Sequence, residues 1–208
     1  MYANIYVDNK VASKEDFPSI FFTTNNSDSK IFLKQPKQIK NITVTDRGTG
    51  GSTLNIGANV NIIRHLHVNF HTNCKVNIGD NCTIGALEIL LDTPNTIINI
   101  GNDCVIGHGV SVRSGDGHTI YDISSKLIIN NPNKEIVIGN HVWIGRQVSI
   151  LKNAEIPSNT IIGMGSVVTK KFVTENCIIA GIPAKVVKEG VNWDMKPTYM
   201  YKDGYYRE

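Results

Sequence analysis

An aliphatic residue recurs at every sixth position along much of this chain, and mostly polar or small residues fill the positions between. The repeat is unbroken at Ile138, Ile144, Ile150, Ile156, Ile162 and Val168. Three such hexads make an 18-residue triangular coil, whose short strands stack in parallel on the next coil about 4.8 Å away. The pattern therefore predicts an all-β fold, a parallel β-helix with aliphatic residues stacked inside, over residues 48–183.

A β-sandwich of many short strands is the alternative fold. It would show period-two alternation with turns about 8–12 residues apart, whereas a fixed period of six favours the β-helix. Asn or Asp often follows the aliphatic residue by three positions, as at Asn59, Asn81, Asp103, Asn153 and Asn159. These residue types tolerate a left-handed backbone, so we expect them at tight corners.

Both ends of the chain depart from the hexad. Residues 1–47 hold only short apolar pieces, and we interpret them as an irregular N-terminal cap that covers the exposed end of the rod. Residues 184–208 form a C-terminal segment, in which 184–190 is predicted to be a short helix. Its last residues are rich in tyrosine, and we expect this tail to dock onto a neighbour or back onto the rod.

The repeat is lost between Val112 and Ile138, and we predict an extended loop over residues 113–135. The loop opens with Arg113-Ser114-Gly115-Asp116-Gly117-His118-Thr119-Ile120-Tyr121-Asp122. Binding and catalytic residues are disproportionately found on loops that a rigid scaffold positions. The break is therefore a candidate site, with His118 as its candidate catalytic group.

Composition narrows the class of protein. The length of 208 residues fits one domain with small appendages, and 41% hydrophobic with only 7% aromatic residues implies a core of Ile and Val. A net charge of +3 gives no reason to expect a nucleic-acid partner. No stretch has transmembrane length, and the N-terminus lacks signal-peptide features, so we expect a soluble cytoplasmic protein.

Cysteine and histidine side chains are common metal ligands, so their spacing bears on whether a metal site is expected. Four cysteines form no CxxC pair, and we predict them to be buried and reduced. His65, His67 and His71 have a spacing that a metal site can use, but we interpret them as surface polar residues on an early coil and expect no metal.

Three ordered segments, 136–145, 162–170 and 180–187, resemble the left-handed β-helix (hexapeptide-repeat) acyltransferase family. The left hand of the helix is implied by this resemblance. The 113–122 loop, the spacing from His118 to Trp143, and residues 187–189 followed by Trp193 are most similar to bacterial capsule polysaccharide and polysialic acid O-acetyltransferases. The resemblance implies acetyl-CoA as co-substrate, a saccharide acceptor, and homotrimers with sites between neighbouring rods.

The resemblance also assigns roles to residues. His118 matches the family's catalytic histidine, a side chain whose pKa suits proton transfer from a hydroxyl, and Trp143 matches the tryptophan at the cleft. The positions matched to CoA binding are Trp143, Gly145, Arg146, Met164, Thr169, Lys170, Lys185 and Lys188. A backbone N–H in the Gly145–Arg146 turn is the candidate donor to the oxyanion.

Loop residues are the candidates for acceptor binding, namely Arg113, Asp116 and Tyr121. Asp116, Asp122 or a backbone carbonyl can orient the protonated His118. The sequence thus predicts an O-acetyltransferase that moves acetyl from acetyl-CoA to a hydroxyl of a cell-surface (capsular) polysaccharide, sialic-acid-containing ones included, or of its sugar precursor. The alternatives are an antibiotic or nucleotide-sugar acetyltransferase of the same fold, and a non-catalytic or metal-binding β-helix scaffold.

Overall fold

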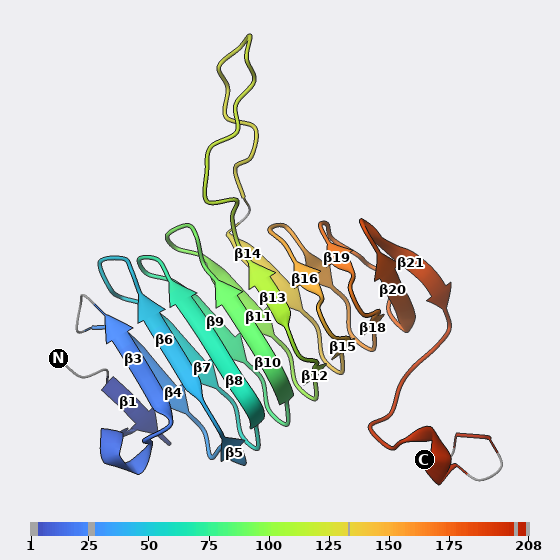
Figure 1. Ribbon diagram of the computed structural model, residues 1–208, viewed down its shortest axis with the longest axis horizontal. Coiled ribbons are helices and arrows are strands. Elements are labelled where there is room, and N and C mark those ends of the chain that lie inside the picture. The colour runs from blue at the N-terminus through green and yellow to red at the C-terminus, as the bar shows by residue number, and fades with distance from the viewer. Residues whose placement is uncertain (1–3, 25–27, 133, 202–203, 207–208) are drawn as a thin grey trace.

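The computed structural model describes residues 4–24, 28–132, 134–201 and 204–206. They form a rod of stacked triangular coils, the left-handed parallel β-helix that the sequence predicts. One long loop stands out from the side of the rod, and the C-terminal tail leaves its far end (Figure 1). Within the described part of the chain, no helix is long and apolar enough to cross a membrane.

The coils stack so that their strands form three faces. Face 1 is a ladder of parallel strands, with one antiparallel strand, β2, at its N-terminal edge. Its strands are β1 (Asn4–Val7), β2 (Lys10–Ala12), β4 (Lys30–Leu33), β7 (Thr53–Ile56), β9 (Lys75–Ile78), β11 (Ile97–Ile100), β14 (Glu135–Ile138) and β17 (Glu155–Ile156).

Faces 2 and 3 are joined because β8 (Asn61–Phe70) and β10 (Thr83–Leu90) each run around the corner between them. Face 2 is completed by β5 (Gln38–Ile39), β12 (Val105–Ile106), β15 (Trp143–Ile144), β18 (Ile161–Ile162), β20 (Cys177–Gly181) and β21 (Ala184–Glu189). Face 3 is completed by β3 (Ile20–Thr24), β6 (Ile42–Asp46), β13 (Val110–Arg113), β16 (Ser149–Ile150) and β19 (Val167–Val168).

The residue that opens each hexad points into the rod. On face 2, Ile84, Ile106, Ile144 and Ile162 pair in register from coil to coil, and each is at most 1% exposed. Matching aliphatic ladders on the other two faces complete one continuous core. All four cysteines are free and buried in it, as predicted.

Coil length changes along the rod. Face 1 partners are 22 residues apart in the early coils, as for Asn55 and Asn77. They are 18 apart later, as for Ile138 and Ile156. The predicted 18-residue coil therefore holds from Ile138 to Val168, after which the partners Ile162 and Ile179 are 17 apart. The extra residues lie between face 3 and face 1, the corner from which loop 113–135 also leaves.

The N-terminal segment belongs to the rod more fully than predicted. Strands β4 and β6 pair in parallel register with β7 and β8, so coil stacking begins well before residue 48. Only β2 and the single-turn 3-10 helix η1 (Lys14–Asp16) match the irregular cap. Residues 1–3 and 25–27 of the predicted cap lie outside the described residues.

The short helix predicted over 184–190 is wrong. Residues 184–189 form β21, which pairs antiparallel with β20 through contacts such as Ile179 with Val186. The β-branched Val186 and Val187 favour a strand, and the free edge of β20 supplies the hydrogen-bonding partner. The tail then holds a second single-turn helix, η2 (Thr198–Met200), away from the rod (Figure 1).

Candidate active site

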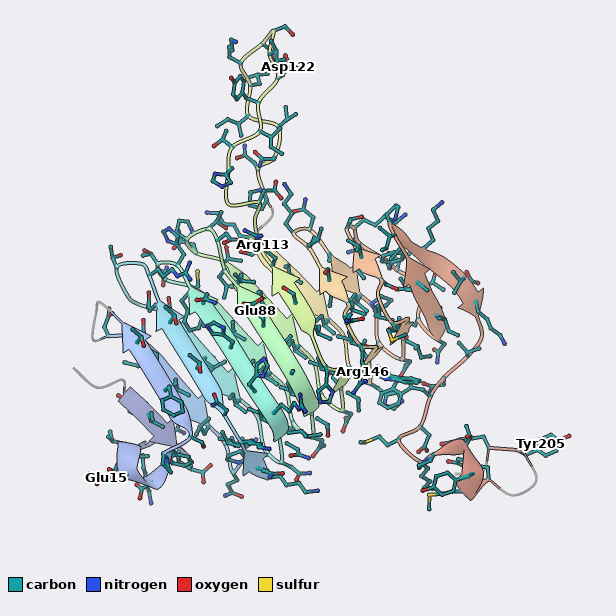
Figure 2. The ribbon with its side chains drawn as sticks, in the orientation of Figure 1. Glu15, Glu88, Arg113, Asp122, Arg146 and Tyr205 are labelled. Carbon is teal, nitrogen blue, oxygen red and sulfur yellow. The ribbon has the colours of Figure 1, made fainter. Side chains whose placement is uncertain are left out.

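The long loop carries His118 and stands away from the rod. Figure 2 shows Arg113 at its base and Asp122 near its far end. The outer part is a two-stranded ribbon, in which the Ile129 N–H donates to the Ile120 carbonyl at 2.9 Å. His118 is exposed and lies in sequence between the base and this ribbon.

Two ion pairs hold the loop base to the coils on either side. The Arg113 Nε donates to Asp92 of the preceding coil at 2.7 Å. Lys152 of the following coil donates to the Asp116 carboxylate and, at 3.1 Å, to the Asn130 carbonyl. The hydrogen bond from Lys152 holds the pKa of Asp116 below its usual range, and a bond from the Asn130 amide adds to this effect.

The carboxylates proposed to orient His118 are used elsewhere. Asp116 is bound by Lys152 and Asn130. Asp122 accepts from the backbone and side chains of Ser124 and Ser125, and these bonds lower its pKa to about 2, led by the Ser125 N–H. Among the described residues, neither carboxylate bonds the His118 imidazole, so Asp122 serves the turn at the loop tip.

Tyr121 also lies in this outer ribbon. Its ring is 53% exposed and has the Lys126 ammonium 5.5 Å from its centroid. Its predicted role in acceptor binding is therefore compatible with its accessibility, but no other predicted site residue contacts it in the described structure.

A second set of candidate residues lies on face 2 around Trp143. The Trp143 side chain is 45% exposed, and its ring centroid is 6.1 Å from that of Trp193 in the tail. Trp193 in turn stacks flat on His141, with centroids 4.3 Å apart and planes 8° from parallel. The Trp193 Nε1–H donates to the His141 carbonyl at 2.9 Å, which fixes the tail on the rod.

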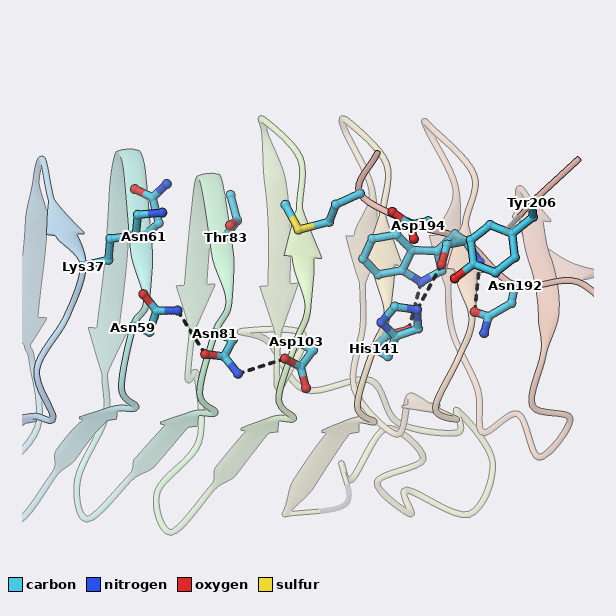
Figure 3. A pocket seen from close by; sticks show the side chains of 12 residues that line it. Lys37, Asn59, Asn61, Asn81, Thr83, Asp103, His141, Asn192, Asp194 and Tyr206 are labelled. Atoms are coloured by element: carbon cyan, nitrogen blue, oxygen red, sulfur yellow. Dashed lines mark hydrogen bonds between the residues drawn. The ribbon is translucent and has the colours of Figure 1, made fainter. Parts of the chain in front are cut away.

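His141 continues a row of corner residues between faces 1 and 2. It has φ of 54°, close to the 56°, 59° and 57° of Asn59, Asn81 and Asp103, which confirms the left-handed corners predicted for those three. Side-chain hydrogen bonds join Asn59 to Asn81 and Asn81 to Asp103 (Figure 3). The row lines a groove of about 490 Å³ that Trp193 also lines. Sequence reasoning gave neither His141 nor Trp193 a site role, although the left-handed corner position of His141 is a readable signal.

Gly145 is required by the stacking of the coils. A Cβ atom there would lie 2.8 Å from the Met164 nitrogen and 2.9 Å from the Ile162 oxygen. The Gly145 N–H already donates to the Ile162 carbonyl at 2.9 Å, so it is not available to an oxyanion. The N–H groups of Arg146 and Met164 have no protein acceptor among the described residues, and both residues are exposed between faces 2 and 3.

The basic residues predicted to meet CoA lie on two sides of the rod. Thr169 and Lys170 are exposed after β19, between faces 3 and 1, where the Lys170 Nζ lies 5.3 Å from the Phe172 ring centroid. Lys185 and Lys188 are exposed on β21.

The predicted site residues therefore fall into two sets within one chain. The loop-corner set comprises Arg113, Asp116, His118, Tyr121, Thr169 and Lys170. The face 2 set comprises Trp143, Gly145, Arg146, Met164, Lys185 and Lys188. Since a separate face or corner of the triangle carries each set, one rod alone does not bring them together.

The histidine cluster on the early coils has other contacts. The His67 ring lies 3.3 Å from the Asn69 amide and 3.8 Å from the Glu88 carboxylate. The His71 Nδ1 accepts the Thr72 N–H at 2.7 Å, and His65 is exposed. Across the residues that the structure describes, no three potential ligands gather in a group that could hold a metal ion.

The chain is similar in sequence to a family of bacterial transferases and to an O-acetyltransferase. The family model "Bacterial transferase hexapeptide (six repeats)" matches residues 135–170. The polysialic acid O-acetyltransferase of Escherichia coli O1:K1 / APEC is 38% identical over 120 residues, which are 57% of this chain. The matched region spans only 38% of that relative's length.

Two solved structures are similar over nearly the whole chain. The polySia specific acetyltransferase NeuO superposes with a TM-score of 0.75 at 31% identity, covering 93% of this chain and 78% of that one. The polysialic acid O-acetyltransferase OatWY gives 0.73 at 30% identity, covering 98% and 96%.

Proposed function

The chain belongs to the hexapeptide-repeat acyltransferase family, and from that premise we propose that it acetylates a hydroxyl of a cell-surface polysaccharide or its sugar precursor, with acetyl-CoA as donor. The observation that carries the proposal is the likeness to two polysialic acid O-acetyltransferases over 93% and 98% of the chain. A sialic-acid-containing capsule is the acceptor class that these relatives favour. Because acetyl-CoA is the donor, we assign the reaction to the cytoplasm.

His118 is the proposed general base. A sugar hydroxyl is a weak nucleophile near pH 7, so a base must take its proton as the oxygen attacks the thioester carbonyl carbon. The imidazolium formed then returns the proton to the CoA sulfur when the carbon–sulfur bond breaks. The exposure of His118 on a loop that is anchored at its base supports this role, because both substrates can reach the ring.

The corner after β15 is the proposed binding site for the acyl group. Arg146 and Met164 are exposed residues whose N–H groups lack protein acceptors in the described structure, so these groups can serve the thioester oxygen and the carbonyl oxygens of the pantetheine arm. An N–H aimed at the oxyanion contributes a factor of about 10²–10³ to the rate. Lys185 and Lys188 supply positive charge for the CoA phosphates.

We propose that the site is completed between chains of a homotrimer. The separation of the loop-corner set from the face 2 set supports this, since the loop of one rod then meets face 2 of its neighbour. The loop also exposes Ile120, Ile123, Leu127, Ile128 and Ile129, each at least 52% exposed. So much apolar surface on a thin ribbon is typical of a segment that packs against a partner.

Acetyl transfer to a defined panel of acceptors tests the proposed function. Purified protein is incubated with acetyl-CoA and sialic-acid polymers, neutral capsule oligosaccharides, nucleotide sugars or acetylatable antibiotics. We expect mass spectrometry to show the gain of one or more acetyl groups on the sialic-acid polymers. Transfer to antibiotics alone would contradict the assignment of a saccharide acceptor. CoA binding without any transfer would support acetyl-CoA as the donor but reject the proposed acceptor class.

The His118→Ala variant tests the assigned base. We expect kcat to fall by about 10²–10⁴-fold while CoA affinity and the oligomeric state are unchanged. His65→Ala is the matched control, because His65 is an exposed histidine on an early coil. Full activity in His118→Ala would show that another group removes the proton.

A further inference from the structure

The Asn130 side chain makes three hydrogen bonds to the part of the loop around His118. Its amide oxygen accepts the Ile120 N–H at 2.9 Å, and its amide nitrogen donates to the His118 carbonyl at 2.8 Å. The same nitrogen donates to the Asp116 carboxylate at 2.8 Å. Asn130, on the returning half of the loop, therefore holds the outgoing half at Asp116, His118 and Ile120.

Lys152 connects these contacts to the rod. It follows β16, in the coil after the one that ends at the loop, and donates to both the Asp116 carboxylate and the Asn130 carbonyl. The ammonium side chain is only 21% exposed, and the carboxylate is 34% exposed. The contacts run without a gap from the rod through Lys152, Asp116 and Asn130 to the main chain of His118.

We propose that Asn130 and Lys152 are positioning residues for His118, a proposal that rests on the base role assigned to it above. Asn130 fixes the main chain that follows the histidine, through the His118 carbonyl and the Ile120 N–H, and the Asp116 side chain that precedes it. Lys152 fixes Asn130 and Asp116 relative to the rod. The imidazole itself stays free of these bonds, so it can exchange protons with the substrates. Charge-assisted bonds suit this task because they are shorter and stronger than neutral ones.

Geometry explains why such a device is needed. The loop stands away from the rod (Figure 2), and His118 lies in sequence between the base of the loop and its outer ribbon. A displacement of about 1 Å in a reacting group can lower the rate about 10²-fold. Without an anchor, the position of the His118 imidazole would vary by more than that. The contacts among Lys152, Asp116 and Asn130 restrict its position.

Kinetic measurements on the intact protein test the proposal. In Asn130→Ala and Lys152→Met we expect kcat to fall about 10–100-fold, with the Kd for acetyl-CoA and the unfolding temperature little changed. Lys152→Arg keeps the charge and should recover most of the lost kcat. The rise of kcat with pH should also shift or broaden in Asn130→Ala, because the histidine samples several environments. Asn131→Ala, at the exposed neighbouring residue, is the control.

Hydrogen exchange separates failure of this proposal from failure of the proposed function. Amide exchange of the segment 116–121 should accelerate at least 10-fold in Asn130→Ala and Lys152→Met, whether or not acetyl transfer is detected. Unchanged exchange would overturn the proposal for an active or an inactive enzyme. Normal kcat in both variants, with the wild type active, would also overturn it. An inactive wild type with faster exchange in the variants would reject the acetyltransferase assignment while retaining the positioning contacts.

Discussion

The rod and the loop of this protein are held together by different interactions. In the rod, coils stack through buried Ile and Val and a continuous parallel ladder, and the interior holds one unbroken core. The loop buries almost none of its apolar residues and is held to the rod mainly by polar contacts at its base. The buried core and the proposed base thus lie in different parts, so substitutions in the loop should leave the core largely unaffected.

The largest effect on stability is expected in the aliphatic ladder. Ile144 is fully buried and pairs in register with Ile106 and Ile162. Ile144→Ala removes buried methyl groups and leaves a cavity, so we expect the free energy of unfolding to fall by about 2–5 kcal/mol. Urea titration followed by circular dichroism measures the change.

The loop supplies the matched control for that experiment. Ile123 is 82% exposed in the described chain, and Ile123→Ala should lower the free energy of unfolding by much less than Ile144→Ala, because it opens no cavity inside the rod. Equal destabilisation by the two substitutions would show that the loop contributes to stability as much as the buried core of the rod does.

A smaller effect is expected from the asparagine ladder on face 1. Asn77 accepts from the Asn55 amide at 2.7 Å and donates to the Asn99 carbonyl oxygen at 2.6 Å. Asn77→Ala removes both bonds and leaves two amides with unpaired groups, so we expect a loss of about 1–2 kcal/mol by urea titration. An unchanged free energy of unfolding would mean that water replaces the ladder bonds at no net cost.

The smallest effect concerns acid pH at the loop tip. Bonds from Ser125 and Ser124 lower the pKa of Asp122 to about 2 from 3.8. A carboxylate with a depressed pKa stabilises the folded turn above its unfolded pKa, and this contribution is lost as pH falls from about 4 through about 2. NMR titration should show the Ser125 amide moving in that window, with the rod amides unaffected. A midpoint near 4 would indicate that the turn is not formed in solution.

The sequence predicted those parts of the rod where one residue type at a fixed position determines the local structure. A buried aliphatic position every six residues leaves few other structures open, and the left-handed corners follow from Asn59, Asn81 and Asp103. The first coils were missed because Ile31, Leu33, Ile42 and Val44 alternate along longer strands without a clean hexad. The hairpin of β20 and β21 was missed because the preference of Val186 and Val187 for a strand takes effect only against the free edge of β20, which the local sequence does not show.

For the site, the sequence identified candidate residues but not their arrangement. His118 and Trp143 were chosen from a resemblance to relatives, and which corner carries each follows only once the coils are stacked. The docking of Trp193 on His141 joins residues 52 positions apart and depends on the path of the tail. The contacts of Asn130 likewise require the loop to fold back on itself, which no local pattern encodes.

The separation of the two residue sets has a genetic consequence. If each site is shared by two neighbouring chains, a copy without the loop imidazole and a copy without the face 2 indole are each inactive alone. In a mixed trimer, a site that combines an intact loop with an intact face 2 restores turnover. Co-expressing His118→Ala with Trp143→Ala should therefore recover a fraction of wild-type activity, whereas no activity would return if each chain held a complete site of its own.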